Sequence, residues 1–124
     1  MSILKEIVEN TRSKIILRKA ERSLDAIKQM LKESEIPKGS FKDSLKEKDE
    51  AIIAEIKKAS PSAGIIAPDF NPIQKAKDYE AFGASALSIL TEEDFFMGSM
   101  QYLQDVKAVT SLPILRKDFM IDEY

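Results

Sequence analysis

The stretch Ala51–Lys57, AIIAEIK, decides the fold of this chain. It is apolar until charged residues appear near its end, which is typical of a strand that is buried on both faces. Ser60–Gly64 then reads as a loop, and Asn71 and Pro72 start a helix, with Asn71 as the cap and Pro72 in the first turn. Gly83 ends this helix. The sequence therefore predicts one strand–loop–helix unit.

The same alternation repeats downstream. Ser85–Leu90 is a second candidate for a buried strand, Gly98 and Ser99 open another helix, and Pro113–Phe119 is a third strand that is again charged at its far end. Strands and helices that alternate with a period of about 30 residues are typical of βαβ units and a parallel sheet. We expect a further helix to begin at Ile121–Tyr124.

Upstream of the first strand, the apolar spacing is helical. The stretch from Ile3 to Ile16 predicts a helix with Ser2 as its N-cap. A second helix carries apolar residues from Leu24 to Leu31 and ends near Ile36–Ser40, where Pro and Gly interrupt the pattern. These helices either pack against a core or cover a site.

Two architectures fit this order of elements. A doubly wound, nucleotide-binding sheet usually has a glycine-rich turn after its first strand, and Lys58–Ser62 is not such a turn. A (β/α) barrel carries its chemistry at the C-terminal ends of its strands, where the first and third strands here are charged. The barrel is favoured, and because a complete one has eight strands and about 250 residues, we expect an N-terminal piece of a longer protein. The predicted fold class is α/β, a partial TIM (β/α)8 barrel, with a helical extension over residues 1–48 and the first three strands over residues 49–124.

Composition removes several kinds of chemistry. The 124 residues contain no Cys and no His, which excludes thiol nucleophiles, Cys-ligated metals and imidazole catalysis within this chain. The 19 basic and 21 acidic residues give a net charge of -2, so no basic field exists to bind nucleic acid. The first residues show no signal peptide and no membrane span, and a cytoplasmic location is expected. Because the chain has no His and no Cys, proton transfer must use Lys, Glu, Asp or Tyr.

The charged residues at the strand ends are the candidate catalytic residues. Glu55 and Lys57 lie two residues apart on a strand, so they point to one face near the predicted mouth of the barrel. Lys117 occupies the corresponding end of the third strand and can approach Lys57 across the second. For Glu55 and Lys57 the alternatives are a structural ion pair and a strand end that already lies in solvent, and for Lys117 the alternative is a surface pair with Asp118.

Two further features follow strand ends. Ser60–Gly64 offers hydroxyl and backbone N–H groups that can hold a phosphate, although the same residues also suit a plain turn. Phe95, Phe96 and Phe119 either line a pocket for a flat ring or pack into the core.

Three segments, in order, resemble one known family. Ile53–Ser62 is similar to the first-strand signature of indole-3-glycerol phosphate synthase, Ala86–Glu92 with Phe95–Ser99 resembles its second-strand segment, and Leu112–Phe119 resembles its third. The resemblance implies a carbon–carbon lyase of tryptophan biosynthesis. Such an enzyme closes the ring of 1-(2-carboxyphenylamino)-1-deoxyribulose 5-phosphate, a small phosphorylated substrate, releases CO2 and water, and uses no metal or organic cofactor.

The resemblance also implies roles for matching positions. Lys117 matches the general acid of ring closure, Lys57 a second lysine that contacts the substrate carboxylate or donates a proton in dehydration, and Glu55 a carboxylate that positions lysine and takes part in proton transfer. The remaining matches are a phosphate contact and the apolar walls around the anthranilate ring: Ser60 for the phosphate, and Pro61, Phe96 and Phe119 for the walls.

Two alternatives stay open beside this family. One is another phosphate-handling barrel such as phosphoribosylanthranilate isomerase, whose members use a Cys and an Asp. The other is a non-catalytic module that docks onto a complementary C-terminal half. Since later strands supply further site residues in the family, we expect the fragment alone to be inactive, and its open strand edges predict self-association.

Overall fold

The computed structural model of the chain describes residues 2–34 and 40–124. These residues form two compact units. The first unit contains the described residues up to position 34 together with Phe119–Tyr124, and the second runs from Ser40 to Asp118. Within the described ranges, no helix is both long enough and apolar enough to cross a membrane.

The first unit contains two helices, α1 (Ile3–Glu21) and α2 (Leu24–Glu33). The predicted cap is confirmed, since the Ser2 hydroxyl oxygen accepts the N–H of Lys5 at 3.3 Å. Ser23 caps α2 in the same way through the N–H of Ala26 at 3.1 Å. The predicted end of this helix near Ile36–Ser40 falls mostly on residues 35–39, which lie outside the described residues.

The end of the chain is attached to α1. The Tyr124 hydroxyl lies 2.8 Å from the carbonyl oxygen of Arg22, the residue that follows α1, and 3.0 Å from that of Arg18, which also accepts the N–H of Arg22 at 2.8 Å. Lys19 pairs with Asp122 at 3.1 Å. The prediction of a helix at Ile121–Tyr124 is wrong: these residues are irregular, and the N–H of Tyr124 bonds the Asp122 side chain at 2.8 Å, a local bond that competes with a helical one.

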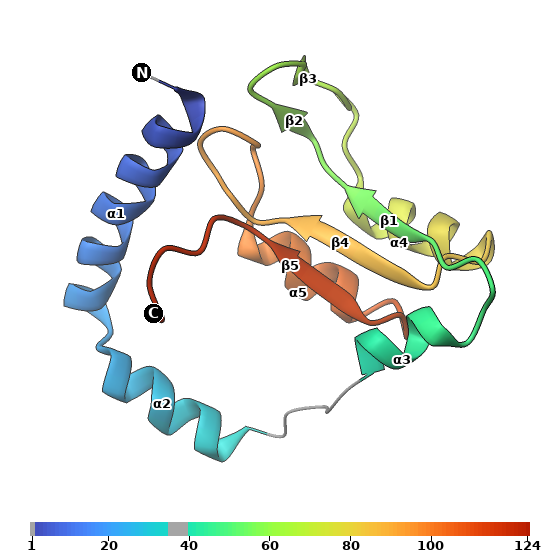
Figure 1. Ribbon diagram of the computed structural model, residues 1–124, viewed down its shortest axis with the longest axis horizontal. Helices are drawn as coiled ribbons and strands as arrows, with labels where there is room; N and C mark the ends of the chain where they lie inside the picture. The colour runs from blue at the N-terminus through green and yellow to red at the C-terminus, as the bar shows by residue number, and fades with distance from the viewer. Residues whose placement is uncertain (1, 35–39) are drawn as a thin grey trace. The chain divides into compact units, whose positions relative to one another are not determined.

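The second unit is built on a three-stranded parallel sheet (Figure 1). Its strands are β1 (Ile53–Ile56), β4 (Ala86–Leu90) and β5 (Ile114–Lys117), in the order β1-β4-β5. Each predicted strand is confirmed, and sequential strands are neighbours, as in the opening strands of a barrel. The central strand β4 is buried along its whole length.

Two helices cover one face of this sheet, α4 (Pro72–Ala81) and α5 (Met100–Lys107). Ala76 of α4 and Val106 of α5 are fully buried in one core with the helix-facing strand residues Ala54, Ile56, Leu87 and Ile89. The predicted cap of α4 is confirmed by a 3.0 Å bond from the N–H of Gln74 to the Asn71 side chain. Gly83 ends the same helix with a φ of 94°, a conformation that favours glycine.

Three features differ from the sequence-based expectations. A short helix, α3 (Ser40–Lys46), precedes the sheet, and the predicted loop at Ser60–Gly64 is a small hairpin of β2 (Ala59–Ser60) and β3 (Gly64–Ile65). The first strand is not buried on both faces, because Ile52 and Ile53 are 60% and 45% exposed. Among the described residues β1 pairs only with β4, so it is an edge strand here.

The buried side chains of the second unit are expected to contribute most of its free energy of unfolding. Leu87→Ala removes a side chain with 0% exposure and should lower the free energy of unfolding by about 2–5 kcal/mol, since it leaves a cavity. Ile65→Ala is the control, because Ile65 is 56% exposed in the small hairpin, and it should cost less than about 1 kcal/mol. Urea unfolding of both variants measures the two values. Equal losses would contradict this assignment of the core.

Candidate active site

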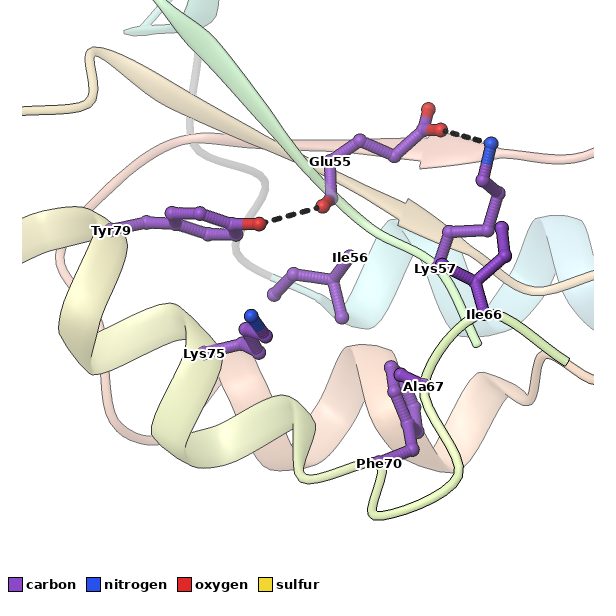
Figure 2. A pocket seen from close by; sticks show the side chains of 8 residues that line it. All are labelled: Glu55, Ile56, Lys57, Ile66, Ala67, Phe70, Lys75 and Tyr79. Carbon is purple, nitrogen blue, oxygen red and sulfur yellow. Dashed lines mark hydrogen bonds and ion pairs between the residues drawn. The ribbon is translucent and has the colours of Figure 1, made fainter. Parts of the chain in front are cut away.

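Three charged side chains meet at the C-terminal ends of β1 and β5. The Lys117 Nζ lies 2.7 Å from one carboxylate oxygen of Glu55, and the Lys57 Nζ lies 3.4 Å from the other. Figure 2 shows Lys57 turned toward the Glu55 carboxylate. The predicted approach of Lys57 and Lys117 across the second strand is therefore confirmed, with Glu55 as the shared partner.

The strand register explains this convergence. Glu55 pairs with Ser88, which in turn pairs with Leu115, so these side chains share the sheet face that α4 and α5 do not cover. Lys117 lies two residues after Leu115 and points to the same face. Ser88 is small, so it leaves room above the central strand, and its hydroxyl donates to Glu55 at 3.4 Å.

The charge balance keeps Glu55 ionised. Partial burial raises the pKa of its carboxyl, but hydrogen bonds and charge attraction from Lys117 and Lys57 together outweigh burial. The resulting pKa lies below the ordinary value of 4.5. At neutral pH the cluster therefore holds one carboxylate between two ammonium groups.

A separate network fixes the strand end around Lys117. Arg116 and Asp118 point to the opposite face, as alternation along a strand requires. The Thr91 hydroxyl donates to Asp118 at 2.7 Å, the Arg116 Nε donates to Thr91 at 3.0 Å, and Arg116 pairs with Asp118 at 3.5 Å. The surface pair of Lys117 with Asp118, weighed above as an alternative, is not the observed arrangement, since Lys117 bonds Glu55.

A cavity of about 340 Å³ lies beside β1 (Figure 2). The Tyr79 hydroxyl, on α4, donates to the Glu55 backbone carbonyl at 3.3 Å across one side of it. Lys57 brings one charge of the cluster into this cavity, whereas Lys117 is not among its lining residues. The lining residues come from β1 and the residue after it, the segment before α4, and α4 itself: Glu55, Ile56, Lys57, Ile66, Ala67, Phe70, Lys75 and Tyr79.

The other predicted site residues follow the strands as expected. Ser60 ends β2, directly after β1, and Pro61 begins the exposed turn between β2 and β3. The Ser60 hydroxyl oxygen accepts the N–H of Ala63 at 3.2 Å, which leaves its proton free to be donated to a ligand. Phe96 is half-buried in the loop after β4. Figure 1 shows the hairpin and this loop beyond the arrowheads of β1 and β4. Phe119 belongs to the other compact unit.

Sequence reasoning missed two buried polar groups, one on β4 and one just after it. Ser88 is the single hydroxyl in the apolar strand Ala86–Leu90, and a buried hydroxyl needs a partner, which is a signal that could have pointed to Glu55. Glu92 is buried just after β4, but its partners are backbone groups that no pattern identifies. In residues 2–34 and 40–124, no group of three or more acidic side chains is placed to hold a metal ion.

Parallel strands joined by helices, with charged side chains converging at their C-terminal ends, define this chain as part of a (β/α) barrel. The family model described as indole-3-glycerol phosphate synthase matches residues 4–124. The chain belongs to the indole-3-glycerol phosphate synthase family.

Similar proteins carry the same description. The indole-3-glycerol phosphate synthase of Clostridium acetobutylicum is 48% identical over 122 residues, which cover 98% of this chain and 47% of that protein. Those of Aliarcobacter butzleri and Neisseria meningitidis serogroup B are 46% and 45% identical, and each match covers 98% of this chain and 48% of the relative. The chain therefore spans about half the length of the curated relatives that it matches.

The lowered pKa of Glu55 predicts a pH-dependent contribution to stability. Because the folded pKa lies below 4.5, the contribution is fully present above that pH and is lost as the pH falls through the folded value. The difference in unfolding free energy between the wild type and Glu55→Gln should therefore shrink between roughly pH 7 and pH 3. Urea unfolding across this range measures it. Glu50→Gln, at an exposed position, is the control and should show a flat difference; a flat profile for Glu55→Gln as well would refute the pairing.

Proposed function

We propose that this chain, within a complete barrel, takes part in the synthesis of indole-3-glycerol phosphate. The substrate is 1-(2-carboxyphenylamino)-1-deoxyribulose 5-phosphate, and ring closure releases CO2 and water. The observation that carries the proposal is the convergence of Lys57 and Lys117 on Glu55 at the catalytic end of the strands, in a chain of this family. A cytoplasmic location is part of the proposal, because a phosphorylated anion crosses a bilayer only at high cost.

Lys117 is proposed as the general acid. When an aromatic carbon attacks the substrate ketone, negative charge develops on the carbonyl oxygen, and a positioned ammonium can protonate it. Glu55 holds that ammonium at 2.7 Å and fixes its direction. Each such positioned proton donor contributes about 10²–10⁴-fold to a rate.

Lys57 and Glu55 are proposed to act in the steps that release CO2 and water. The Lys57 ammonium can bind the carboxylate that leaves as CO2, or it can donate a proton when the hydroxyl leaves as water. Loss of CO2 returns its electron pair to the ring system, so no oxidant or reductant is needed. Proton transfer by Lys and Glu is sufficient for the whole sequence, and we propose no metal or organic cofactor.

The remaining predicted residues are proposed to bind the substrate. Ser60 donates its hydroxyl proton to the phosphate, and Pro61, Phe96 and Phe119 form the apolar walls around the anthranilate ring. Holding the ring against the sugar chain favours closure by proximity.

A second candidate function is that of a docking half-barrel. It is favoured by the edge of β1 that pairs with no strand among the described residues, and by the cavity of about 340 Å³ beside it. A barrel closes when its last strand pairs with its first, so the proposed occupant of this edge is the last strand of the remaining half. Docking and catalysis are compatible, since a docked half would complete the site.

The catalytic proposal is tested in a complete barrel, made by following this chain with the remaining half of the Clostridium acetobutylicum relative. We expect turnover in this chimera, and a loss in kcat of about 10²–10⁴-fold for Lys117→Met. Lys107→Met, at an exposed helix position, is the control and should leave the rate unchanged. Steady-state assays of product formation measure both. A Lys117→Met variant within a few-fold of the parent would overturn the assigned role, and the 124-residue chain alone should show no turnover.

Exposed strand residues predict that the chain alone self-associates. Ile53 and Leu115 are exposed on the sheet face that α4 and α5 leave uncovered, and such apolar surface promotes association. Light scattering should give a mass above the 14.0 kDa of the monomer, and Leu115→Lys should lower it. Adding the missing half should replace the self-associated chain by a one-to-one complex of the two halves. A monomer that binds no dye specific for apolar surface would contradict this expectation.

A further inference from the structure

The loop that follows β4 is organised by one buried carboxylate. Glu92 is 5% exposed, and its two carboxylate oxygens accept N–H groups of the residues that follow it. Oε1 accepts from Asp94 at 3.0 Å, and Oε2 accepts from Phe95 at 2.7 Å and from Phe96 at 3.0 Å. Three consecutive backbone N–H groups therefore converge on a single side chain.

The far end of the loop is tied back to the same residue. The N–H of Gly98 donates to the Glu92 carbonyl oxygen at 2.7 Å, so the chain between them makes a closed turn. A Cβ at position 98 would collide with the Leu90 carbonyl and lie 2.8 Å from the Glu92 carbonyl oxygen, and only glycine allows this approach. Met97 adopts a φ of 53°, which a residue other than glycine keeps only where its surroundings hold it.

These contacts fix one residue of chemical interest. Phe96 donates its N–H to Glu92, and its ring is one of the walls proposed above for the substrate. A hydrogen bond to an ionised acceptor is stronger than a neutral one, so the carboxylate is well suited to hold this backbone in one conformation. A glutamine at this position would have the same shape but only one acceptor oxygen. Its amide nitrogen would turn N–H donors toward backbone N–H groups that need an acceptor.

We propose that Glu92 is a positioning residue, whose carboxylate presets the loop of residues 92–98 so that the Phe96 ring is held ready for the substrate ring. The proposal rests on the proposed function for the identity of the substrate, but its structural part is independent of that function. Glu92 touches no reacting atom, and its effect on the reaction passes through Phe96. Substrate binding, rather than the proton transfers, should therefore depend on it.

The structural part is tested in the chain itself by amide hydrogen exchange. In Glu92→Gln, the amides of Asp94, Phe95 and Phe96 should exchange at least about 10-fold faster than in the wild type. The Leu87 amide, which bonds the Pro113 carbonyl at 3.0 Å in the sheet, should be unchanged. Glu50→Gln is the control for loss of a carboxylate at an exposed position.

A second variant disturbs the loop from its other end. Gly98→Ala keeps the carboxylate but places a methyl group against the Leu90 carbonyl, and it should expose the same three amides. Loop amides that exchange at the wild-type rate in both variants would overturn the proposal. Faster exchange throughout the sheet as well would also overturn it, because Glu92 would then be a general stabilising residue.

The functional part is tested in the complete chimeric barrel. Glu92→Gln should raise KM about 10-fold and leave kcat within about three-fold, the pattern of lost uniform binding. A fall in kcat at unchanged KM would overturn the link from Glu92 through Phe96 to binding. If the parent chimera shows no turnover, the proposed function fails, while the exchange rates still decide whether Glu92 presets the loop.

Discussion

A half-buried carboxylate needs a compensating positive charge. The arrangement of the site depends on which ammonium groups supply this charge to Glu55. One ammonium comes from Lys57, just past the end of the same strand, and the other from Lys117, two strands away. Neighbouring strands lie about 4.8 Å apart, so a lysine on β5 must reach over the whole of β4. The small side chain of Ser88 leaves that path open. The parallel order β1-β4-β5 and a small residue on the central strand are therefore conditions for the cluster to form.

Local signals were sufficient for the main elements of the fold. Asn71 and Gly83 delimit α4 as their chemistry predicts, because capping and left-handed conformations depend on a few neighbouring atoms. The short elements escaped prediction: α3 has seven residues, and β2 and β3 have two each, too few to produce a periodic pattern. Burial of Ile53 was overestimated, because an apolar run does not reveal whether both faces of its strand are covered.

Some residues of the site could likewise be predicted from local sequence patterns, and others could not. Glu55, Lys57 and Lys117 could be predicted, because charge at the end of a buried strand is unusual and alternation gives its direction. Glu92 could not, since its partners are backbone N–H groups brought together by a tight turn. The network of Thr91, Arg116 and Asp118 likewise depends on which strands pair. Residue type thus predicted the charged groups, while pairing and turn geometry determine what holds them in place.

The central claim is that two ammonium groups from different strands hold one carboxylate. Nuclear magnetic resonance titration of the Glu55 side-chain carbon tests it most directly, in the wild type, Lys57→Met and Lys117→Met. The account predicts a wild-type pKa below 4.5 and a rise in both variants, larger for Lys117→Met because that bond is the shorter, at 2.7 Å against 3.4 Å. A Glu55 titration that neither substitution moves would show that the lysines do not share this carboxylate and would contradict the account.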